Sequence, residues 1–434
     1  MEILAIPFFK ELIAEARSFK TPLYVVGGAV RDRLLNRDST DFDLTGNRAV
    51  EIARAIASKT RYTLVKLDDT PGRETLRVIV TDPIQFDFTT LQGEDIESDL
   101  KQRDYTLNAL AISAEDFINE KDNYIDPCKG QADIESKTIR AVSARSLEED
   151  PLRMLRGIRF AALLDFSIDP ETLNQIAQRA ERLRESAAER VLYELKLYLG
   201  SNNATKHFGS LYDCGLFKIL FPGVTDSKEI LKARLALIES NTPLPQSPDE
   251  EEMVVPRRPN PALLKLSALL FSLGGETDHD ISPIADFLKS MKASNAEIAT
   301  ICHSIQTGHL FLKGPQESGD AAMYRFCRQT HPSFKEGLAL AGAVNPQWSV
   351  DSATGLRSIT SFYETVFLPG LDKEALINGN DLIHNFNIHP GPLFKTILDA
   401  VEEAKVLGSI SNKEEALAFA KNMTQKIQFQ QGEQ

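Results

Sequence analysis

The hydrophobic pattern of the first 140 residues alternates between two periods. Four short apolar runs have the length and composition of strands: residues 23–26, 64–66, 76–80 and 84–89. Residues 28–35 and 48–58 instead repeat apolar side chains at helical spacing. This mixture predicts a head of the α/β or α+β class. Residues 1–20 interleave charged and apolar side chains, so we expect an amphipathic helix there and not a secretory signal.

The strand pattern nearly disappears from about residue 151 onward. The later segments with helical periodicity are residues 151–164, 170–183, 187–199, 261–271 and 393–402. Residues 241–261 are rich in proline and charge, which marks the clearest loop or domain boundary, and a softer boundary lies near residues 140–150. The pattern therefore predicts a mixed head over residues 1–140 and two helical parts, residues 141–240 and 241–434.

The composition excludes several classes of protein. The 434 residues contain 42% hydrophobic and 26% charged side chains, the proportions of an ordinary globular chain. No apolar run approaches the roughly 20 residues that a membrane-spanning helix needs. The four cysteines are far apart and form no CxxC pair, which predicts no zinc framework and favours a reducing, cytoplasmic location.

The charge balance is ambiguous about nucleic acid. A net charge of −13 argues mildly against it, because neutralisation of phosphates is the main source of affinity. Locally, however, nine arginines and no lysine lie between Arg140 and Arg190. The planar fork of arginine suits phosphates and base edges. The alternative is a set of helix surfaces on which arginines pair with Glu148, Glu181 and Glu185.

A glycine pair after the first predicted strand is the first candidate for ligand binding. In LYVVGGAVRDRLLNRDSTDFDLTGN, residues 23–47, Gly27 and Gly28 stand between a strand and a helix. Glycine lets the backbone approach a ligand closely, and the first turn of a helix offers unpaired N–H groups to a phosphate. Arg31 follows on the first turns and can pair with the same phosphate. The alternative is a simple tight turn.

Three aspartates form the second candidate group. Asp41 and Asp43 are two residues apart, so in a strand both carboxylates project from one face. They repel unless a cation lies between them, and Mg²⁺ prefers oxygen ligands. Asp87 lies between Phe86 and Phe88, which we expect to face the core, so that Asp87 faces the opposite side. Three carboxylates with Mg²⁺ are typical of phosphoryl or nucleotidyl transfer, whereas a DxD pair alone is also typical of an exposed turn.

Five motifs occur in order along the chain: GGAVRD, DFDL, RDYTLNALAI, EEDPLRMLRGIRFAALLDFSID and ERVLYELK. With LINGNDLIHNFNIHPGPLFKTILDAVEEAKVLGSI near the C-terminus, they resemble the class II tRNA nucleotidyltransferase and poly(A) polymerase family. The similarity is strong over the head and residues 140–225 and looser elsewhere. It implies an α+β fold: a polymerase-β-type nucleotidyltransferase head, then an all-α neck (141–240) for base recognition and RNA binding, and a body and tail (241–434) for tRNA binding.

The resemblance also implies roles for individual residues. Asp41 and Asp43 would be catalytic and hold the metal, with Asp87 as a third acid. The implied nucleotide-binding residues are Gly27, Gly28, Arg31, Asp32, Arg103, Asp104, Asn108, Glu149, Asp150, Arg153 and Arg156. The implied RNA-binding residues are Arg159 and Arg190, which together with Arg156 also suit a purely local structural role.

Within this set, Asp150 and Arg153 are suited to selecting a base. Pro151 suits the first position of a helix and Asp150 its N-cap, which would put the two side chains about one turn apart. Asp accepts hydrogen bonds and Arg donates them. Cytosine and adenine both present an amino donor beside a ring-nitrogen acceptor, whereas uracil and guanine present the reverse. The pair can therefore accept C and A and reject U and G, and the alternative is a plain N-cap with a salt bridge.

One departure from the family bears on the product. Only LQGEDIESDLKQ separates Thr90 from Arg103, whereas full CCA-adding members have a longer flexible loop here. In addition, Gln92 and Gln102 stand where the family usually has arginine. A short loop resembles the CC-adding subgroup, so we expect CMP transfer from CTP to the 3′ hydroxyl of tRNA, with Mg²⁺ and a separate A-adding enzyme acting next. The alternatives are full CCA addition using CTP and ATP, A addition, poly(A) polymerisation, or an RNA-binding protein with an inactive head.

A second metal site is a weaker hypothesis. His279-Asp280, with His303 and His309, is compatible with a metal-dependent phosphohydrolase of the HD type, a domain that some family members carry. The matching helix, ALLFSLGGE, lacks the expected His-Asp pair. We therefore favour a structural helical region.

Overall fold

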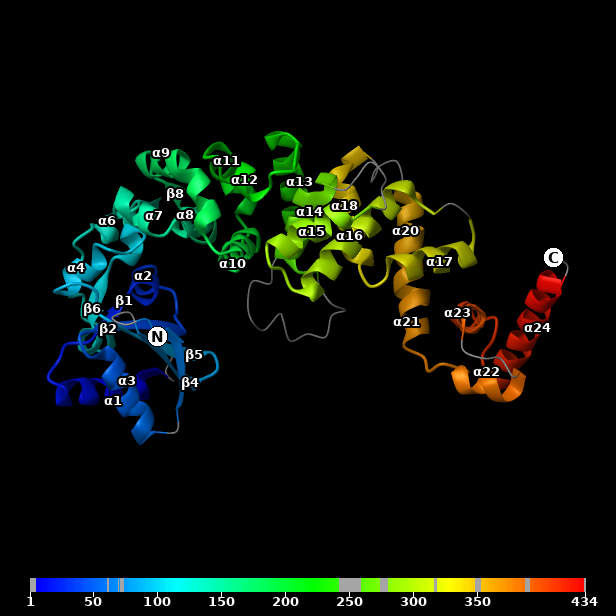
Figure 1. Cartoon of the computed structure of the whole chain (residues 1–434), viewed down its shortest axis with the longest axis horizontal. Coiled ribbons are helices and arrows are strands. Elements are labelled where there is room, and N and C mark those ends of the chain that lie inside the picture. The colour runs from blue at the N-terminus through cyan, green and yellow to red at the C-terminus, as the bar shows by residue number, and fades with distance from the viewer. Residues whose placement is uncertain are drawn as a thin grey trace. The chain divides into compact units, whose positions relative to one another are not determined.

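The computed structural model describes residues 5–60, 62–68, 70, 74–241, 259–273, 280–315, 318–347, 353–386 and 391–432. The chain divides into two compact units, Met1–Val224 and Thr225–Gln434 (Figure 1). This boundary at Val224 differs from the predicted boundaries at residues 140 and 240. The predicted division into three parts stays a prediction. Residues 242–258, most of the predicted boundary segment, lie outside the described residues.

A six-stranded mixed sheet forms the head of the first unit, in the order β3-β4-β5-β2-β1-β6. Strand β2 runs parallel to β5, and the other neighbours in the sheet are antiparallel. The strands are β1 Tyr24–Val26, β2 Asp41–Gly46, β3 Thr63–Asp68, β4 Thr75–Thr81, β5 Ile84–Thr90 and β6 Ala111–Ser113. All four predicted strands are therefore confirmed to within two residues at each end, and β6 is a short strand that the sequence pattern did not reveal.

Alternation along β2 and β5 separates an aromatic face from an acidic face. Phe42, Phe86 and Phe88 are at most 1% exposed, while Asp43 pairs in register with Asp87 on the other face. The rings of Phe42 and Phe86 stack at a centroid distance of 4.9 Å, and Phe8 lies 4.3 Å from Phe86. The helices of the head are α1 Ala5–Ser18, α2 Gly28–Leu34, α3 Ala49–Lys59, α4 Ile96–Leu100, η1 Thr106–Asn108 and α5 Ala114–Ile118. The hydrophobic core thus packs against one face of the sheet, and the aspartates lie on the opposite face.

Helices dominate the remainder of the first unit, as the pattern predicts. They are α6 Gly130–Glu135, α7 Ala144–Glu149, α8 Leu152–Leu164, α9 Pro170–Arg179, η2 Ala180–Glu185, α10 Ala188–Leu199, α11 Ala204–Asp213 and α12 Leu216–Leu220. One detail departs from an all-α neck, because β7 (Thr138–Ile139) and β8 (Ser167–Ile168) form a two-stranded parallel sheet. The helix expected over residues 170–183 ends at Arg179 and continues as η2.

The described part of the second unit is helical. Its helices are α13 Lys228–Asn241, α14 Pro261–Leu270, η4 Phe271–Leu273, α15 Ser282–Ser290, α16 Asn295–Lys313, α17 Asp320–Thr330, α18 Phe334–Val344, α20 Ala353–Phe362, η5 Tyr363–Phe367, α21 Leu368–Leu371, α22 Gly379–Phe386, α23 Pro392–Val406 and α24 Lys413–Gly432. Stacked rings, such as Phe334 on Tyr363 at 3.9 Å, fill its core. Among the helices of the described residues, none is long and apolar enough to cross a membrane.

Candidate active site

A left-handed glycine begins the site. Gly27 follows β1 with φ of 70°, and its N–H donates to the carbonyl of Leu110 at 3.1 Å. A Cβ atom on Gly27 would lie 3.1 Å from Nη1 of Arg103 and 3.5 Å from Oδ2 of Asp43. The glycine is therefore required both by the backbone conformation and by close packing against two predicted site residues.

Asp41 and Asp43 project from one face of β2, opposite to the buried Phe42. The pKa of Asp43 is raised to about 6, chiefly by loss of surrounding water and also by the carboxylates of Asp41 and Asp87, while Arg103 opposes the rise. Desolvation, followed by the charge of Asp87, also raises the pKa of Asp41. Burial and mutual repulsion therefore outweigh the nearby arginines, so two ionised carboxylates at these positions are not fully compensated. Two oxygen ligands with a deficit of positive charge fit a hard divalent cation.

Asp87 lies in the same acidic row but already has a cation. Arg77 of β4 is its partner in register and donates from Nε and Nη2 to the two carboxylate oxygens, both at 2.7 Å. The side chains of Arg77 and Asp87 are 26% and 13% exposed. Within the described residues, no group of three or more His, Cys, Asp or Glu side chains is arranged to hold a metal ion. The predicted third acid, Asp87, therefore lies beside Asp43 but differs from Asp41 and Asp43 in its bidentate pairing with Arg77.

A polar chain links α2 to the segment around η1. Arg31 donates to both oxygens of Asp32 and, through Nη1, to Oδ1 of Asn108 at 2.9 Å. Asn108 in turn donates to Asp104 at 3.2 Å, and Asp104 accepts from Nε of Arg156 at 2.9 Å. Burial alone would raise the pKa of Asp104, but Arg156 and Asn108 outweigh burial and lower it. Five predicted nucleotide-binding residues are thus one continuous hydrogen-bonded set.

An open cleft of about 420 Å³ joins the acidic face to the arginines. Its lining residues are Val26, Asp43, Leu44, Thr45, Asp68, Thr75, Thr89, Gln92, Asp99, Gln102, Arg103, Glu149 and Arg153. Arg103 is oriented by Asp99, which accepts from its Nε and Nη2 at 3.2 and 3.1 Å. The structure therefore brings residues from three of the five motifs, DFDL, RDYTLNALAI and the EEDP segment, to the wall of one cavity.

The two residues predicted to select the base, Asp150 and Arg153, lie at the junction of α7 and α8. Helix α8 begins at Leu152, one residue later than the expected start, so Asp150 is not its N-cap, although Oδ1 of Asp150 accepts from the Leu152 N–H at 3.2 Å. Oδ2 of Asp150 accepts from Nη2 of Arg190 at 2.8 Å. Arg153 donates from Nη1 to the carbonyl of Ser146 at 3.0 Å and makes no salt bridge with Asp150 among the described contacts.

The nine arginines from Arg140 to Arg190 differ in whether they form an ion pair with a carboxylate. Eight form ion pairs: Arg140 with Asp133 and Asp169, Arg145 with Glu149, Arg156 with Asp104 and Glu194, Arg159 with Glu194, Arg179 with Glu148, Arg182 with Glu185, Arg184 with Glu181, and Arg190 with Asp150. In the described part of the chain, Arg153 alone of the nine lacks such a partner. The interpretation as paired helix surfaces therefore holds for most of the segment, and the exception lines the cleft.

Several residues around the site were not predicted from the sequence. Glu194 is 3% exposed and lies within 3.4 Å of both Arg156 and Arg159. Arg159, a predicted RNA-binding residue, is itself 8% exposed and lies over the ring of Phe160 at 4.2 Å. This environment favours the local structural role that the sequence left open. The ERVLYELK motif contains Glu194, so the motif was a signal for it, whereas Arg77 lies outside every motif.

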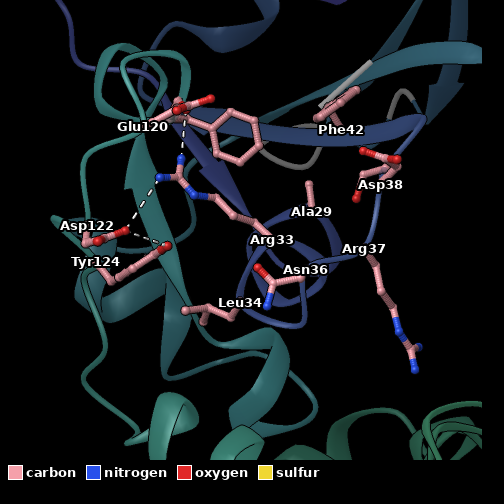
Figure 2. A pocket seen from close by; sticks show the side chains of 12 residues that line it. Ala29, Arg33, Leu34, Asn36, Arg37, Asp38, Phe42, Glu120, Asp122 and Tyr124 are labelled. Carbon is pink, nitrogen blue, oxygen red and sulfur yellow. Dashed lines mark hydrogen bonds and ion pairs between the residues drawn. The ribbon is translucent and has the colours of Figure 1, made fainter.

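A larger cavity of about 560 Å³ lies beside α2. Figure 2 shows Arg33 extending toward Asp122, with Arg37 pointing away from that pair. Phe42 lines this cavity and projects from the buried face of β2, opposite to Asp41 and Asp43. The larger cavity is therefore separate from the acidic face.

The histidines of the second hypothetical metal site are only partly described. His279 lies outside the described residues, and Asp280 accepts from the Ser282 N–H at 2.9 Å. His303 and His309 line a cavity of about 310 Å³ whose other walls are Gln306, Thr307, Leu310, Lys313 and Gln329. These neighbours supply no carboxylate or thiolate.

Three families match successive parts of the chain. The Poly A polymerase head domain matches residues 23–140, the probable RNA and SrmB-binding site of polymerase A matches residues 165–228, and the putative tRNA nucleotidyltransferase domain 2 matches residues 266–420. The first two contain most of the motifs described above.

Full-length relatives show the same similarity. The CC-adding tRNA nucleotidyltransferase of Synechocystis sp. is 30% identical, over 92% of this chain and 93% of its own. The CCA-adding enzyme of Streptococcus suis is 27% identical, over 95% of this chain and 94% of its own. Among solved structures, a CCA-adding enzyme in complex with CTP superimposes with a TM-score of 0.71 at 23% identity, covering 98% of this chain and 96% of that one.

Proposed function

The chain belongs to the tRNA nucleotidyltransferase and poly(A) polymerase family of enzymes, and we propose that it transfers CMP from CTP to the 3′ hydroxyl of tRNA. Pyrophosphate leaves, and addition stops after two cytidines. The observation that carries the proposal is the single cleft lined by Asp43, Arg103, Glu149 and Arg153. It combines a carboxylate that attracts cations, a phosphate-binding arginine and a base-reading arginine.

Asp41 and Asp43 are the residues that would hold the cation. Enzymes of this family use divalent metal ions, and Mg²⁺ is our proposal for this chain. When bound, such an ion lowers the pKa of an attacking hydroxyl and neutralises charge on the leaving pyrophosphate. Asp87, held by Arg77, would support this face and would not be a ligand in the state described here.

The protein's own cations orient the nucleotide. Arg103 lines the cleft and is aimed by Asp99, and Arg31 lies at the start of α2 beside the Gly27 turn. We propose that Arg103 and the Gly27–Gly28 backbone contact the triphosphate, while Arg31, Asp32 and Asn108 set the sugar. The ion pair between Asp104 and Arg156 supports this arrangement.

Arg153 and Asp150 would read the base. Arg153 lines the cleft and has no carboxylate partner among the described residues, so its guanidinium can donate to the ring-nitrogen acceptor of cytosine. Asp150 would accept from the cytosine amino group. Its outer oxygen now accepts from Arg190, whose side chain is 56% exposed, so solvent can replace that contact when a base arrives. Uracil would present a carbonyl to Asp150 and an N–H to Arg153, leaving both without a partner.

The segment between β5 and Arg103 supports the CC-adding subtype. Asp95 caps α4, Asp99 accepts from the Gln92 N–H at 2.9 Å, and Gln102 donates to the carbonyls of Gln92 and Ser98. These hydrogen bonds join residues within the short segment. A loop that helps the site change from CTP to ATP needs freedom to move, and this segment has little. Because CC-adding and CCA-adding relatives match almost equally well, full CCA addition is the second candidate.

The test uses three tRNA transcripts, which end before CCA, after C and after CC. Each receives CTP, ATP or both, with Mg²⁺, and the products are resolved to single nucleotides. We expect extension to stop at CC even when ATP is present, which would require a separate A-adding enzyme downstream. Completion of CCA would refute the loop argument. Addition of A to the CC-ended transcript alone, or long A tails, would identify the other subtypes, and tRNA binding without incorporation would identify an inactive head.

A further inference from the structure

One buried tyrosine connects the nucleotide-binding segment to the base-reading helix. Tyr105 follows Arg103 and Asp104 in the RDYTLNALAI motif and is 0% exposed. Its hydroxyl donates to the backbone carbonyl of Arg153 at 2.7 Å. Arg153 is the second residue of α8 and lies 48 positions from Tyr105 in the sequence. The contact is therefore made to the main chain of the very residue whose side chain lines the cleft.

The sequence of α8 is adapted to this contact. A Cβ atom on Gly157 would lie 2.2 Å from the Tyr105 hydroxyl oxygen and 2.7 Å from Cζ. Any side chain at this position would push the ring away from the helix, so glycine is needed despite its cost of about 1 kcal/mol within a helix. The ring of Tyr105 also meets Phe160 edge to face at 5.9 Å. Gly157 and Phe160 follow Arg153 on the same helix.

A second contact fixes the same two elements. Asp104 pairs with Arg156 at 2.8 Å, and its other oxygen accepts from the Tyr105 N–H at 2.8 Å. Two neighbouring residues of one segment thus hold two points of α8 one turn apart. Burial raises the pKa of the Tyr105 hydroxyl, so the hydroxyl remains a protonated donor throughout any working pH range.

We propose that the Tyr105 hydroxyl is a positioning group for base selection, which fixes the main chain at Arg153 relative to Arg103. This inference rests on the proposed function, because it assumes that Arg153 reads the base. A displacement of α8 would move the guanidinium relative to the phosphate site. The site would then accommodate uracil more readily, because rejection depends on polar groups being held where uracil leaves them unpaired.

The test compares two tyrosines of equal burial in the same unit. Tyr198 is also 0% exposed, and its hydroxyl also donates to a backbone carbonyl, that of Ala204, at 2.7 Å. Tyr105→Phe and Tyr198→Phe therefore each delete one buried hydroxyl. For each variant, kcat/KM is measured with CTP and with UTP on a tRNA lacking CCA, and Tm is measured in parallel.

We expect Tyr105→Phe to lower the CTP-over-UTP ratio of kcat/KM by about tenfold, which corresponds to ~1.4 kcal/mol of lost discrimination. Tyr198→Phe should lower Tm to a similar extent and leave the ratio within about twofold of the wild-type value. A purely structural hydroxyl would reduce both activities by the same factor. Equal ratios in Tyr105→Phe and wild type would overturn the proposal, as would an equal drop in both variants.

A substitution on the opposite side of the contact gives an independent measurement. Gly157→Ala forces the Tyr105 hydroxyl away from Arg153 and should lower the CTP-over-UTP ratio in the same direction. The double variant should lose less discrimination than the product of the two single effects, because both act on one contact. An unchanged ratio in Gly157→Ala, or fully multiplicative losses, would count against the proposal.

Binding measurements separate this inference from the proposed function. If the wild-type protein adds no nucleotide to any transcript, the proposed function fails. The dissociation constants of CTP and UTP with Mg²⁺ are then compared between wild type and Tyr105→Phe. A smaller preference for CTP in the variant would still support the positioning role of Tyr105, and an unchanged preference would refute it.

Discussion

The pairing of Arg77 with Asp87 predicts a stability change that depends on divalent cations. Arg77→Met keeps most of the aliphatic volume and removes the only cation that the structure places against the Asp87 carboxylate within the described residues. Asp41, Asp43 and Asp87 then lie on one face of the sheet without that neutralising charge. The variant should be less stable than wild type in the absence of metal.

The burial of the pair sets the magnitude. Breaking a fully buried ion pair by removing one partner costs about 3–5 kcal/mol, and the exposures of 26% and 13% place this pair below that range, at about 2–3 kcal/mol. For a unit of roughly this size, each kcal/mol lowers Tm by about 2–4 °C, so we expect a decrease of about 4–12 °C. The exposed pair of Arg54 and Glu74 provides the control, because Arg54→Met should cost at most about 1 kcal/mol.

Thermal unfolding with and without Mg²⁺ distinguishes this electrostatic reasoning from ordinary loss of packing. An added divalent cation replaces the missing positive charge, so Mg²⁺ should raise Tm more in Arg77→Met than in wild type. Replacing both partners, as Arg77→Met with Asp87→Leu, should recover part of the lost stability in the absence of metal. The reasoning is refuted if Arg77→Met costs no more than Arg54→Met, or if Mg²⁺ leaves the difference from wild type unchanged.

Three further predictions concern the acidic face, the Gly27 turn and the buried arginine cluster around Glu194. Asp43 keeps its proton in the fold up to a pH of about 6 instead of 3.8, so the metal-free protein should lose stability as pH rises between these values. In unfolding measured as a function of pH, Asp43→Asn should lack this loss of stability, and the variant should add no CMP. Parallel curves of stability against pH for Asp43→Asn and wild type would contradict the prediction. Gly27→Ala adds strain at positive φ and a Cβ atom against Arg103, so primer extension should fall at least about tenfold while Tm falls by only a few degrees. Glu194→Gln leaves the buried Arg159 without its carboxylate partner, whereas Arg156 keeps Asp104, and it should cost about 3–5 kcal/mol in denaturant unfolding. A loss below about 1 kcal/mol would show that the cluster is well hydrated.

The strands of the head could be predicted because burial on one side imposes a strict alternation. Phe86 and Phe88 flank Asp87 in sequence, and the structure confirms that they face the core while Asp87 faces away. The same reasoning could not identify Arg77 as the partner of Asp87. That pairing depends on the register between β4 and β5, which is set by the connecting turn and by a register shift near Ile79.

Contacts between distant segments were the main part that local patterns could not supply. Asp104 and Arg156 are 52 positions apart, and Tyr105 meets Arg153 across 48. Resemblance to a family placed these residues in one site without saying what each contacts. It also could not reveal that Gly157 makes room for Tyr105, because a single glycine inside a helical pattern gives no indication of its neighbour.

The arginine-rich segment shows how composition and geometry combine in this protein. An excess of arginine over lysine predicts recognition of phosphates or bases only if the guanidinium groups are available. Here carboxylates pair with eight of the nine arginines, and three of these eight pair with a residue three or four positions away on the same helical segment. Ion pairs of this kind leave less positive charge available to phosphates than unpaired arginines would. Arg153 differs in its position. It lies just after the interruption between helices α7 and α8, and its side chain lines the cleft. A negative net charge and a nucleotide site are therefore compatible. Under the proposed function, selectivity would depend on Arg153, which has no carboxylate partner among the described residues, and not on the sum of charges.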